Sequence, residues 1–202
     1  MKSTESSTYD YVVVGAGSAG AIIAARLSDD ADVSVLLLEA GPDDGAFTIR
    51  MPAAVSINIK RNRYNWQFRT EPQAALGGRT LYQPRGKVLG GSSSLNGMIF
   101  IRGHALDYDR WVDEGATGWS YADVVPYFKR IEDFCEGADP YRGVGGAIPV
   151  TRGWASSPLH AGFIEAGQQA GHPLSADVNG RQQHGVSYFD KNIKGGERWS
   201  TS

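Results

Sequence analysis

The feature that most constrains this chain is a run of three closely spaced glycines near its start. Gly15, Gly17 and Gly20 follow the β-branched stretch Tyr9 to Val14 and precede the Ala- and Ile-rich stretch Ala21 to Leu27. This order predicts a strand, a glycine turn and a helix. In such a turn the first glycine permits the bend, the second lets the backbone approach a pyrophosphate, and the third lets helix and strand pack closely. The pattern therefore predicts a phosphate site at a helix N-terminus.

A second apolar run, Val33 to Leu38, ends at Glu39. It is typical of a parallel strand buried on both faces and completes a βαβ unit. An acid at this position, about 20 residues after the glycines, accepts hydrogen bonds from ribose hydroxyls. Residues 40 to 44 contain no Arg or Lys for a 2′-phosphate, which argues against NADP. FAD, NAD and a glycine turn of some other α/β protein remain open on this motif alone.

Another glycine-rich segment follows the first motif at a distance. Gly90 and Gly91 precede the three serines 92–94, and an apolar run, Met98 to Ile101, comes shortly after them. Paired glycines and serines do not suit a core strand, and we expect them to offer the amides and hydroxyls that a pyrophosphate and a flavin edge require. The alternative, a flexible Gly/Ser linker, does not explain the apolar run.

The segment from Gly86 to Gly103, continued by residues 107–111, resembles the signature of the glucose-methanol-choline oxidoreductases, and most of all their choline-dehydrogenase branch. Other stretches resemble family segments in the same order: residues 11–20, 36–41, 64–66, 70–72, 118–121 and 177–180. The resemblance covers nearly the whole chain and identifies it as the N-terminal portion of such an enzyme.

The resemblance implies FAD as the cofactor. It places one group of residues at the pyrophosphate and adenosine, namely Gly15, Gly17, Ser18, Ala19, Gly20, Glu39 and Ala40. It places a second group near the remaining phosphate and the flavin, namely Gly90, Gly91, Ser92, Asn96, Gly97 and Met98, with Trp66 and Arg85 as weaker additions. Some relatives bind the flavin covalently through a histidine before the signature asparagine. Leu95 stands there in this chain, so we expect non-covalent FAD.

The resemblance also implies hydride transfer from a primary alcohol to flavin N5, with a C-terminal histidine as base. None of His104, His160, His172 and His184 matches that position, so no catalytic residue is expected in this chain. A βαβ unit without its further strands should not fold stably alone, and we expect a second polypeptide to carry the C-terminal half. Two other functions stay open: an FAD-binding protein or inactive fragment without turnover, and an NAD-dependent dehydrogenase.

The expected fold class is α/β, α+β overall. We predict a Rossmann-like FAD-binding domain over 1–152, incomplete and including a flavin-covering segment at about 43–110, and the start of an antiparallel-sheet substrate domain over 153–202. Residues 43–81 lack clear periodicity and are expected to be irregular, with one short helix.

Three further elements are predicted in the later part of the chain. Ser120 and Asp123 form a capping-box pattern for a helix that ends near Phe134. A second helix, with Leu159, Phe163, Ala166 and Ala170 on one face, begins at Pro158 and stops at Gly171, and a strand over 186–193 leads to a Gly195–Gly196 turn.

Composition excludes some functions. Gly makes up 26 of 202 residues, about twice the usual ~7%. The 20 Lys and Arg are balanced by 22 Asp and Glu, so nucleic acid is not an expected partner. Cys135 is the single cysteine, no metal-ligand spacing is present, and no apolar run is long enough to span a bilayer. We expect a cytoplasmic protein that acts on a small-molecule alcohol, with peripheral membrane contact left open.

Overall fold

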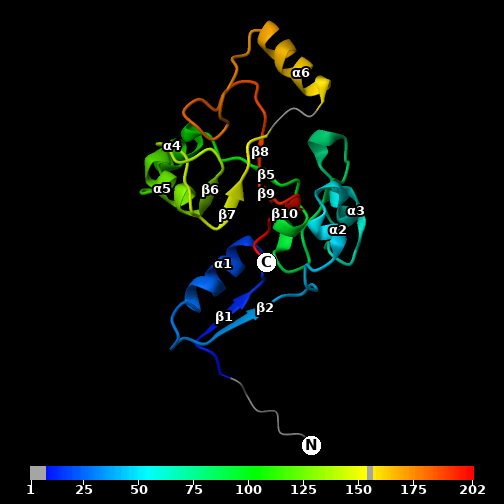
Figure 1. Ribbon diagram of the computed structural model, residues 1–202. Coiled ribbons are helices and arrows are strands. Elements are labelled where there is room, and N and C mark those ends of the chain that lie inside the picture. Colours follow the sequence, from blue (N-terminus) through cyan, green and yellow to red (C-terminus); the bar gives the residue numbers. More distant parts are fainter. Residues whose placement is uncertain (1–7, 154–156) are drawn as a thin grey trace, which may run out of the picture. The chain divides into compact units, whose positions relative to one another are not determined.

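The computed structural model describes residues 8–153 and 157–202, and it mixes short helices with short strands (Figure 1). The chain divides into two compact units. The first comprises residues 1–97 and 196–202, and the second comprises residues 98–195. The predicted domain boundary near residue 152 stays a prediction.

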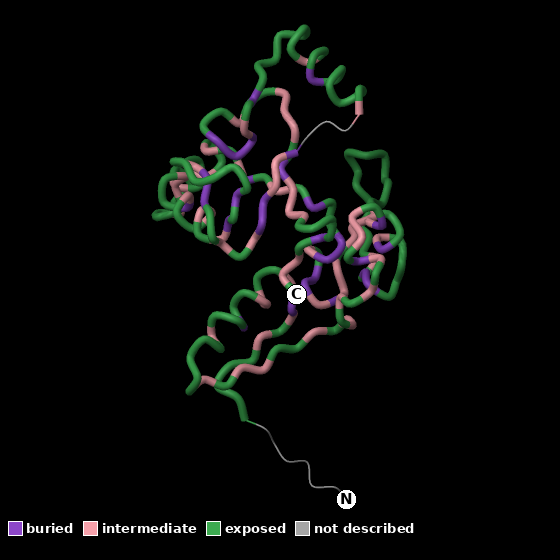
Figure 2. The backbone as a smooth tube through the Cα atoms, in the orientation of Figure 1, coloured by how far each residue is buried: buried purple, intermediate pink, exposed green. Residues whose placement is uncertain are grey.

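The first unit begins with the predicted βαβ arrangement. Strands β1 (Tyr11–Val14) and β2 (Val35–Leu38) pair in parallel, with Tyr11 opposite Val35, and helix α1 (Ser18–Leu27) connects them (Figure 1). The predicted burial of the second strand on both faces is wrong for this chain. Leu37 is 37% exposed and Leu38 46% exposed, and Figure 2 shows most of this region as exposed or intermediate.

The segment after β2 is more ordered than its sequence indicated. It contains two short α-helices and two 3-10 helices, followed by a third 3-10 helix in the glycine–serine segment: α2 (Phe47–Arg50), η1 (Pro52–Ala54), α3 (Val55–Lys60), η2 (Ala74–Leu76) and η3 (Gly91–Ser94). Strands β3 (Phe68–Arg69) and β4 (Tyr82–Gln83), which lie between α3 and η3 in the sequence, pair antiparallel. Ile49, Tyr64, Val88 and Leu95 form a small buried core. The prediction of one short helix was wrong, because the residues that form this core are not spaced at a helical period in the sequence.

The second unit contains two small sheets. Strand β5 (Ile99–Phe100) pairs antiparallel with β8 (Asp190–Lys191), and β6 (Glu132–Phe134) pairs in parallel with β7 (Ile148–Val150). The remaining strands are β9 (Ile193–Lys194) and β10 (Glu197–Arg198), the latter in the first unit. The predicted strand over 186–193 is therefore limited to β8 and the start of β9. Gly195 and Gly196 connect β9 to β10 with positive φ, as the predicted turn requires.

Three helices complete the second unit: α4 (Ala105–Asp113), α5 (Tyr121–Ile131) and α6 (Pro158–Gln169). The Ser120–Asp123 capping box is confirmed, with each residue accepting a hydrogen bond from the other's backbone amide. The predicted end near Phe134 is wrong, because Glu132 already belongs to a strand. In α6 the buried residue is Ile164, whereas Leu159 and Phe163 of the predicted apolar face are exposed.

Buried charges hold the second unit together. Glu132 accepts from Arg102 at 2.5 Å and pairs with Arg142 at 2.6 Å, and Arg142 also pairs with Asp190 at 2.7 Å. Glu132, Arg142 and Asp190 have no exposed surface. A buried cation and anion are tolerated only when each is paired and hydrogen-bonded. This network explains why the strands that carry Glu132 and Asp190 lie where they do.

Candidate functional site: a glycine-lined nucleotide pocket

The first glycine motif forms the predicted turn between β1 and α1. Gly15 has a φ of 96°, which L side chains rarely adopt. A Cβ at Gly20 would lie 1.9 Å from the carbonyl oxygen of Gly15, so no other residue fits there. Gly17 is the N-cap of α1, and no side chain caps that end. The first amides of the helix therefore remain available to an anionic group.

Glu39 has a role in this turn that its sequence position did not reveal. One carboxylate oxygen accepts a hydrogen bond from the Ala16 amide and the other accepts one from the Gly41 amide, each at 2.9 Å. The side chain thus ties the end of β2 to the glycine turn. Each oxygen still has a further lone pair, so the expected contact with ribose hydroxyls remains compatible with this arrangement.

The second glycine segment lies directly against the first. The Gly90 amide donates to the carbonyl of Ala16 at 2.8 Å, and Gly17 and Gly90 form a parallel β-bridge. A Cβ at Gly91 would lie 2.7 Å from the Cα of Gly17. Two segments far apart in the sequence are therefore in backbone contact, and at Gly91 only a glycine allows them to approach this closely.

The three serines do not all face a ligand, which corrects the prediction. The Ser93 hydroxyl donates to the carbonyl of Gly90 at 2.7 Å, and the fully buried Ser94 hydroxyl donates to that of Leu89 at 2.6 Å. Both hydroxyls close the turn of η3. Ser92 is exposed, and its hydroxyl oxygen accepts from the Gly86 amide at 3.1 Å.

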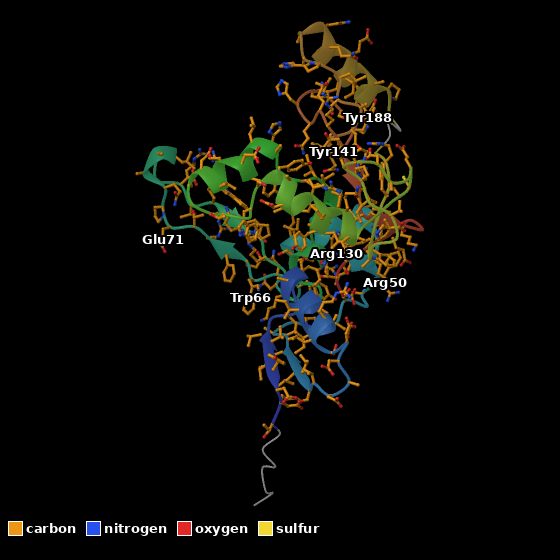
Figure 3. All side chains as sticks on the ribbon, turned by 90° about the vertical axis from the view of Figure 1, so that its left-hand side faces the viewer. Arg50, Trp66, Glu71, Arg130, Tyr141 and Tyr188 are labelled. Atoms are coloured by element: carbon orange, nitrogen blue, oxygen red, sulfur yellow. The ribbon has the colours of Figure 1, made fainter. Side chains whose placement is uncertain are left out.

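An aromatic wall stands beside these glycines. The rings of Trp66 and Phe68 are stacked, with centroids 5.8 Å apart and planes 4° from parallel. Trp66, labelled in Figure 3, lies on the loop that leads into β3, and its amide donates to the carbonyl of Arg85 at 2.9 Å. The buried Asn65 side chain accepts from the amides of Gln67 and Arg85 and so fixes this wall.

These elements enclose a cavity of about 730 Å³ within the first unit. That volume lies inside the usual range of about 300–1,000 Å³ for small-molecule sites. Nine of the fifteen predicted site residues line it: Gly15, Gly17, Ser18, Glu39, Ala40, Trp66, Arg85, Gly91 and Ser92. Four lining residues were missed by the sequence analysis, namely Val14, Leu38, Phe68 and Gly86. The two strand ends could have been inferred from the βαβ pattern, whereas Phe68 and Gly86 gave no separate signal.

The other six predicted residues do not line this cavity. Gly20 packs beneath the turn and Gly90 is buried against Ala16, while Ala19 and Gly97 are exposed. Asn96 lines a neighbouring cavity of about 310 Å³ with Leu95 and, like the first cavity, with Arg85, Gly86 and Ser92. Met98 belongs to the second unit, where it is buried and has a φ of 57°.

The expectation that none of the four histidines is catalytic stays a prediction. All four are exposed, and the His104 ring accepts a hydrogen bond from the Leu106 amide as the N-cap of α4. Over residues 8–153 and 157–202, no three His, Cys, Asp or Glu side chains gather as a metal site would require. None of the helices described is long and apolar enough to span a membrane.

The paired glycine segments match a known family. A family model described as GMC oxidoreductase matches residues 9–202. The chain belongs to the GMC oxidoreductase family. It is 52% identical over 201 residues to the mitochondrial choline dehydrogenase of Homo sapiens. The match covers 96% of this chain and 34% of that protein. It is 50% identical over 198 residues to the oxygen-dependent choline dehydrogenase of Photobacterium profundum, covering 97% of this chain and 35% of the relative.

Longer chains of known structure contain a region with the same fold as this chain. Pyridoxine 4-oxidase from Mesorbium loti superposes with a TM-score of 0.89 at 41% identity, covering 96% of this chain and 38% of that one. An FAD-dependent oxidoreductase from Chaetomium thermophilum superposes with a TM-score of 0.84 at 30% identity, covering 96% and 35%. This GMC chain thus spans about a third of the length of the relatives it matches.

Proposed function

We propose that this GMC chain is the FAD-binding portion of an oxidoreductase that oxidises a primary alcohol, such as choline, to an aldehyde. The observation that carries the proposal is the backbone contact between the two glycine segments beside one cavity. A dinucleotide needs backbone amides at its pyrophosphate and room at both ends. One segment supplies an uncapped helix N-terminus, and the other supplies a turn that reaches a second cavity.

The residues present fit FAD. Gly15, Gly17 and Ser18 would meet the pyrophosphate, because the free amides at the start of α1 favour a negative charge. Glu39 would accept from the adenosine ribose. Ser92 and Asn96, which line the cavities on the other side, would face the flavin end. The other predicted residues keep their assignment as part of this proposal: Ala19, Gly20, Ala40, Trp66, Arg85, Gly90, Gly91, Gly97 and Met98.

When bound, FAD supplies the hydride acceptor that alcohol oxidation requires. This chain contributes binding and orientation: Glu39 holds the glycine turn, and the 3-10 turn over Gly91–Ser94 holds the second segment against it. The base that removes the hydroxyl proton is expected in a C-terminal part. We propose that part, whether on a second polypeptide or not, as the partner of this chain, and we keep a cytoplasmic location in the proposal.

A visible absorption spectrum of the purified protein tests the cofactor. A flavin spectrum supports the proposal, and a colourless protein that takes up no added FAD refutes it. Acid precipitation then tests the mode of attachment. Because Leu95 has no nucleophilic nitrogen, the yellow colour should leave with the supernatant. Colour that stays in the pellet would contradict non-covalent binding.

A second candidate is an FAD-binding protein without turnover. Its support is the expectation that the catalytic base lies in a C-terminal part and not in this chain. Mixing the flavin-loaded protein with choline under anaerobic conditions separates the two candidates, with and without the C-terminal part of a relative. Bleaching of the flavin only when the C-terminal part is present supports the oxidoreductase. The third possibility, an NAD-dependent dehydrogenase, predicts no flavin spectrum.

A further inference from the structure

Arg198 is a buried cation that donates hydrogen bonds to the second glycine segment. It lies in β10, within the first unit, and only 7% of its surface is exposed. Its Nε donates to the carbonyl of Ile49 at 3.0 Å. One terminal nitrogen donates to the carbonyl of Ser93 at 3.0 Å and to the Asn96 side-chain oxygen at 2.9 Å. One guanidinium thus joins α2, the end of η3 and the signature asparagine.

The residues after Arg198 continue this contact. The Thr201 amide donates to the Ser93 hydroxyl at 3.1 Å, and the two hydroxyl groups of these residues lie 3.1 Å apart. Ser202 donates to the Asp44 carboxylate at 2.5 Å. We name residues 198–202 the brace. The brace contacts Ser93, and the two residues before Ser93 in the same turn, Gly91 and Ser92, line the proposed nucleotide cavity.

The charge of Arg198 is not neutralised within the described residues. No carboxylate there lies within ion-pair distance of it, and its second terminal nitrogen is buried without a hydrogen-bond partner. Loss of hydration lowers its pKa to about 10. A side chain selected only to fill this space would be apolar, because an unpaired buried cation opposes folding. The hydrogen bonds of Arg198 to Ser93 and Asn96 therefore explain why an arginine occupies this position.

We propose that Arg198 is a positioning residue of the cofactor cradle, fixing η3 and the Asn96 side chain in the arrangement that receives FAD. The inference rests on the proposed function for its ligand, but the ordering of the turn does not depend on it. Removing the guanidinium would remove the hydrogen bonds to the Ser93 carbonyl and to the Asn96 side-chain oxygen, while leaving the contact between Gly17 and Gly90 and the β1–β2 pairing intact.

Two substitutions and one control test the proposal. Arg198→Met approximately keeps the volume and removes the hydrogen bonds. Arg198→Lys keeps the charge, but its single nitrogen cannot occupy the separate positions of Nε and the terminal nitrogen of arginine. Arg61→Met is the matched control, because Arg61 is exposed at the end of α3 and its backbone makes the hydrogen bonds with Asn58 and Tyr64. All proteins are prepared with FAD, and a cofactor-free sample of each is made from the same preparation.

The first readout is amide hydrogen exchange in the cofactor-free protein. The amides of Leu95 and Asn96 both donate to the Ser92 carbonyl, so they report on the turn. Hydrogen bonds to a charged donor are strong enough that losing two should speed their exchange at least tenfold in Arg198→Met. Strands β1 and β2 should exchange as in the wild type. Unchanged exchange at Leu95 and Asn96 would overturn the proposal, and so would an equal rise throughout the protein, which indicates a general role in stability.

The second readout is the FAD dissociation constant. We expect Arg198→Met to weaken binding at least tenfold, Arg198→Lys to restore part of it, and Arg61→Met to leave it unchanged. Equal affinity for wild type and Arg198→Met would overturn the proposal. A wild-type protein that binds no FAD would refute the proposed function instead, and the exchange of Leu95 and Asn96 would then decide alone whether Arg198 orders the turn.

Discussion

Replacing Gly91 with alanine tests whether the two glycine segments must be in contact. Gly91 has a φ of 55°, and its added Cβ would lie 2.7 Å from the Cα of Gly17. Carbon atoms ordinarily approach to about 3.5–4.0 Å, so the segments would have to separate. The left-handed conformation costs an alanine about 1–2 kcal/mol. Overpacking adds about 1–3 kcal/mol. We therefore expect the free energy of unfolding to fall by about 2–5 kcal/mol.

Gly77→Ala is the matched control, because it isolates the backbone effect. Gly77 has a φ of 64°, and a Cβ there would meet nothing within 4 Å. Its substitution should lower the free energy of unfolding by only about 1–2 kcal/mol. Urea unfolding of both variants measures the difference, and an FAD titration measures the effect on the cavity. We expect weaker FAD binding in Gly91→Ala alone. Equal destabilisation and unchanged affinity in the two variants would refute the argument that close approach at Gly17 shapes the site.

Three further substitutions test other parts of the molecule. Glu39→Gln places an amide group against backbone N–H donors, so the free energy of unfolding should fall by about 1–3 kcal/mol in urea and FAD affinity should fall with it; unchanged values would contradict the role of Glu39 in the turn. Glu132→Gln removes the carboxylate that pairs with the buried Arg102, while Arg142 keeps Asp190, and should lower the free energy of unfolding by about 3–5 kcal/mol. Glu114→Gln, at an exposed ion pair, should change it by less than about 1 kcal/mol, and a similar loss in both would argue against the buried network. The Ser34 hydroxyl and amide donate to Asp10 and lower the pKa of its carboxyl. Ser34→Ala should raise that pKa in an NMR titration. It should also reduce the stability that the ionised carboxylate contributes at a pH above its ordinary pKa, which is the part of the stability that is lost as the pH falls.

The parts that the sequence predicted well depend on neighbouring residues. The Ser120–Asp123 capping box requires only a hydroxyl and a carboxylate three positions apart, and both hydrogen bonds are present. The glycine turn is equally local, because the positive φ of Gly15 and the crowding at Gly20 arise within six residues of chain. Neighbouring residues alone are therefore enough to predict these elements and the candidate glycines.

Element ends and side-chain roles depended on distant partners. The α5 helix stops at Ile131 because Glu132 pairs with a strand and with buried arginines. Leu159 had the spacing of a core residue, yet it is exposed. Spacing along a helix shows which residues share a face, but it does not show what, if anything, covers that face.

The sequence by itself determined that a strand, a glycine turn and a helix begin this chain and that a second glycine–serine segment follows. Only the tertiary structure decided that Gly17 and Gly90 touch, that Glu39 bonds the turn, and that Arg198 reaches Ile49, 149 positions earlier. The physical reason is the range of the interactions. Backbone propensity and capping act over a few residues, whereas close packing and buried hydrogen bonds form between groups that only the complete fold brings together.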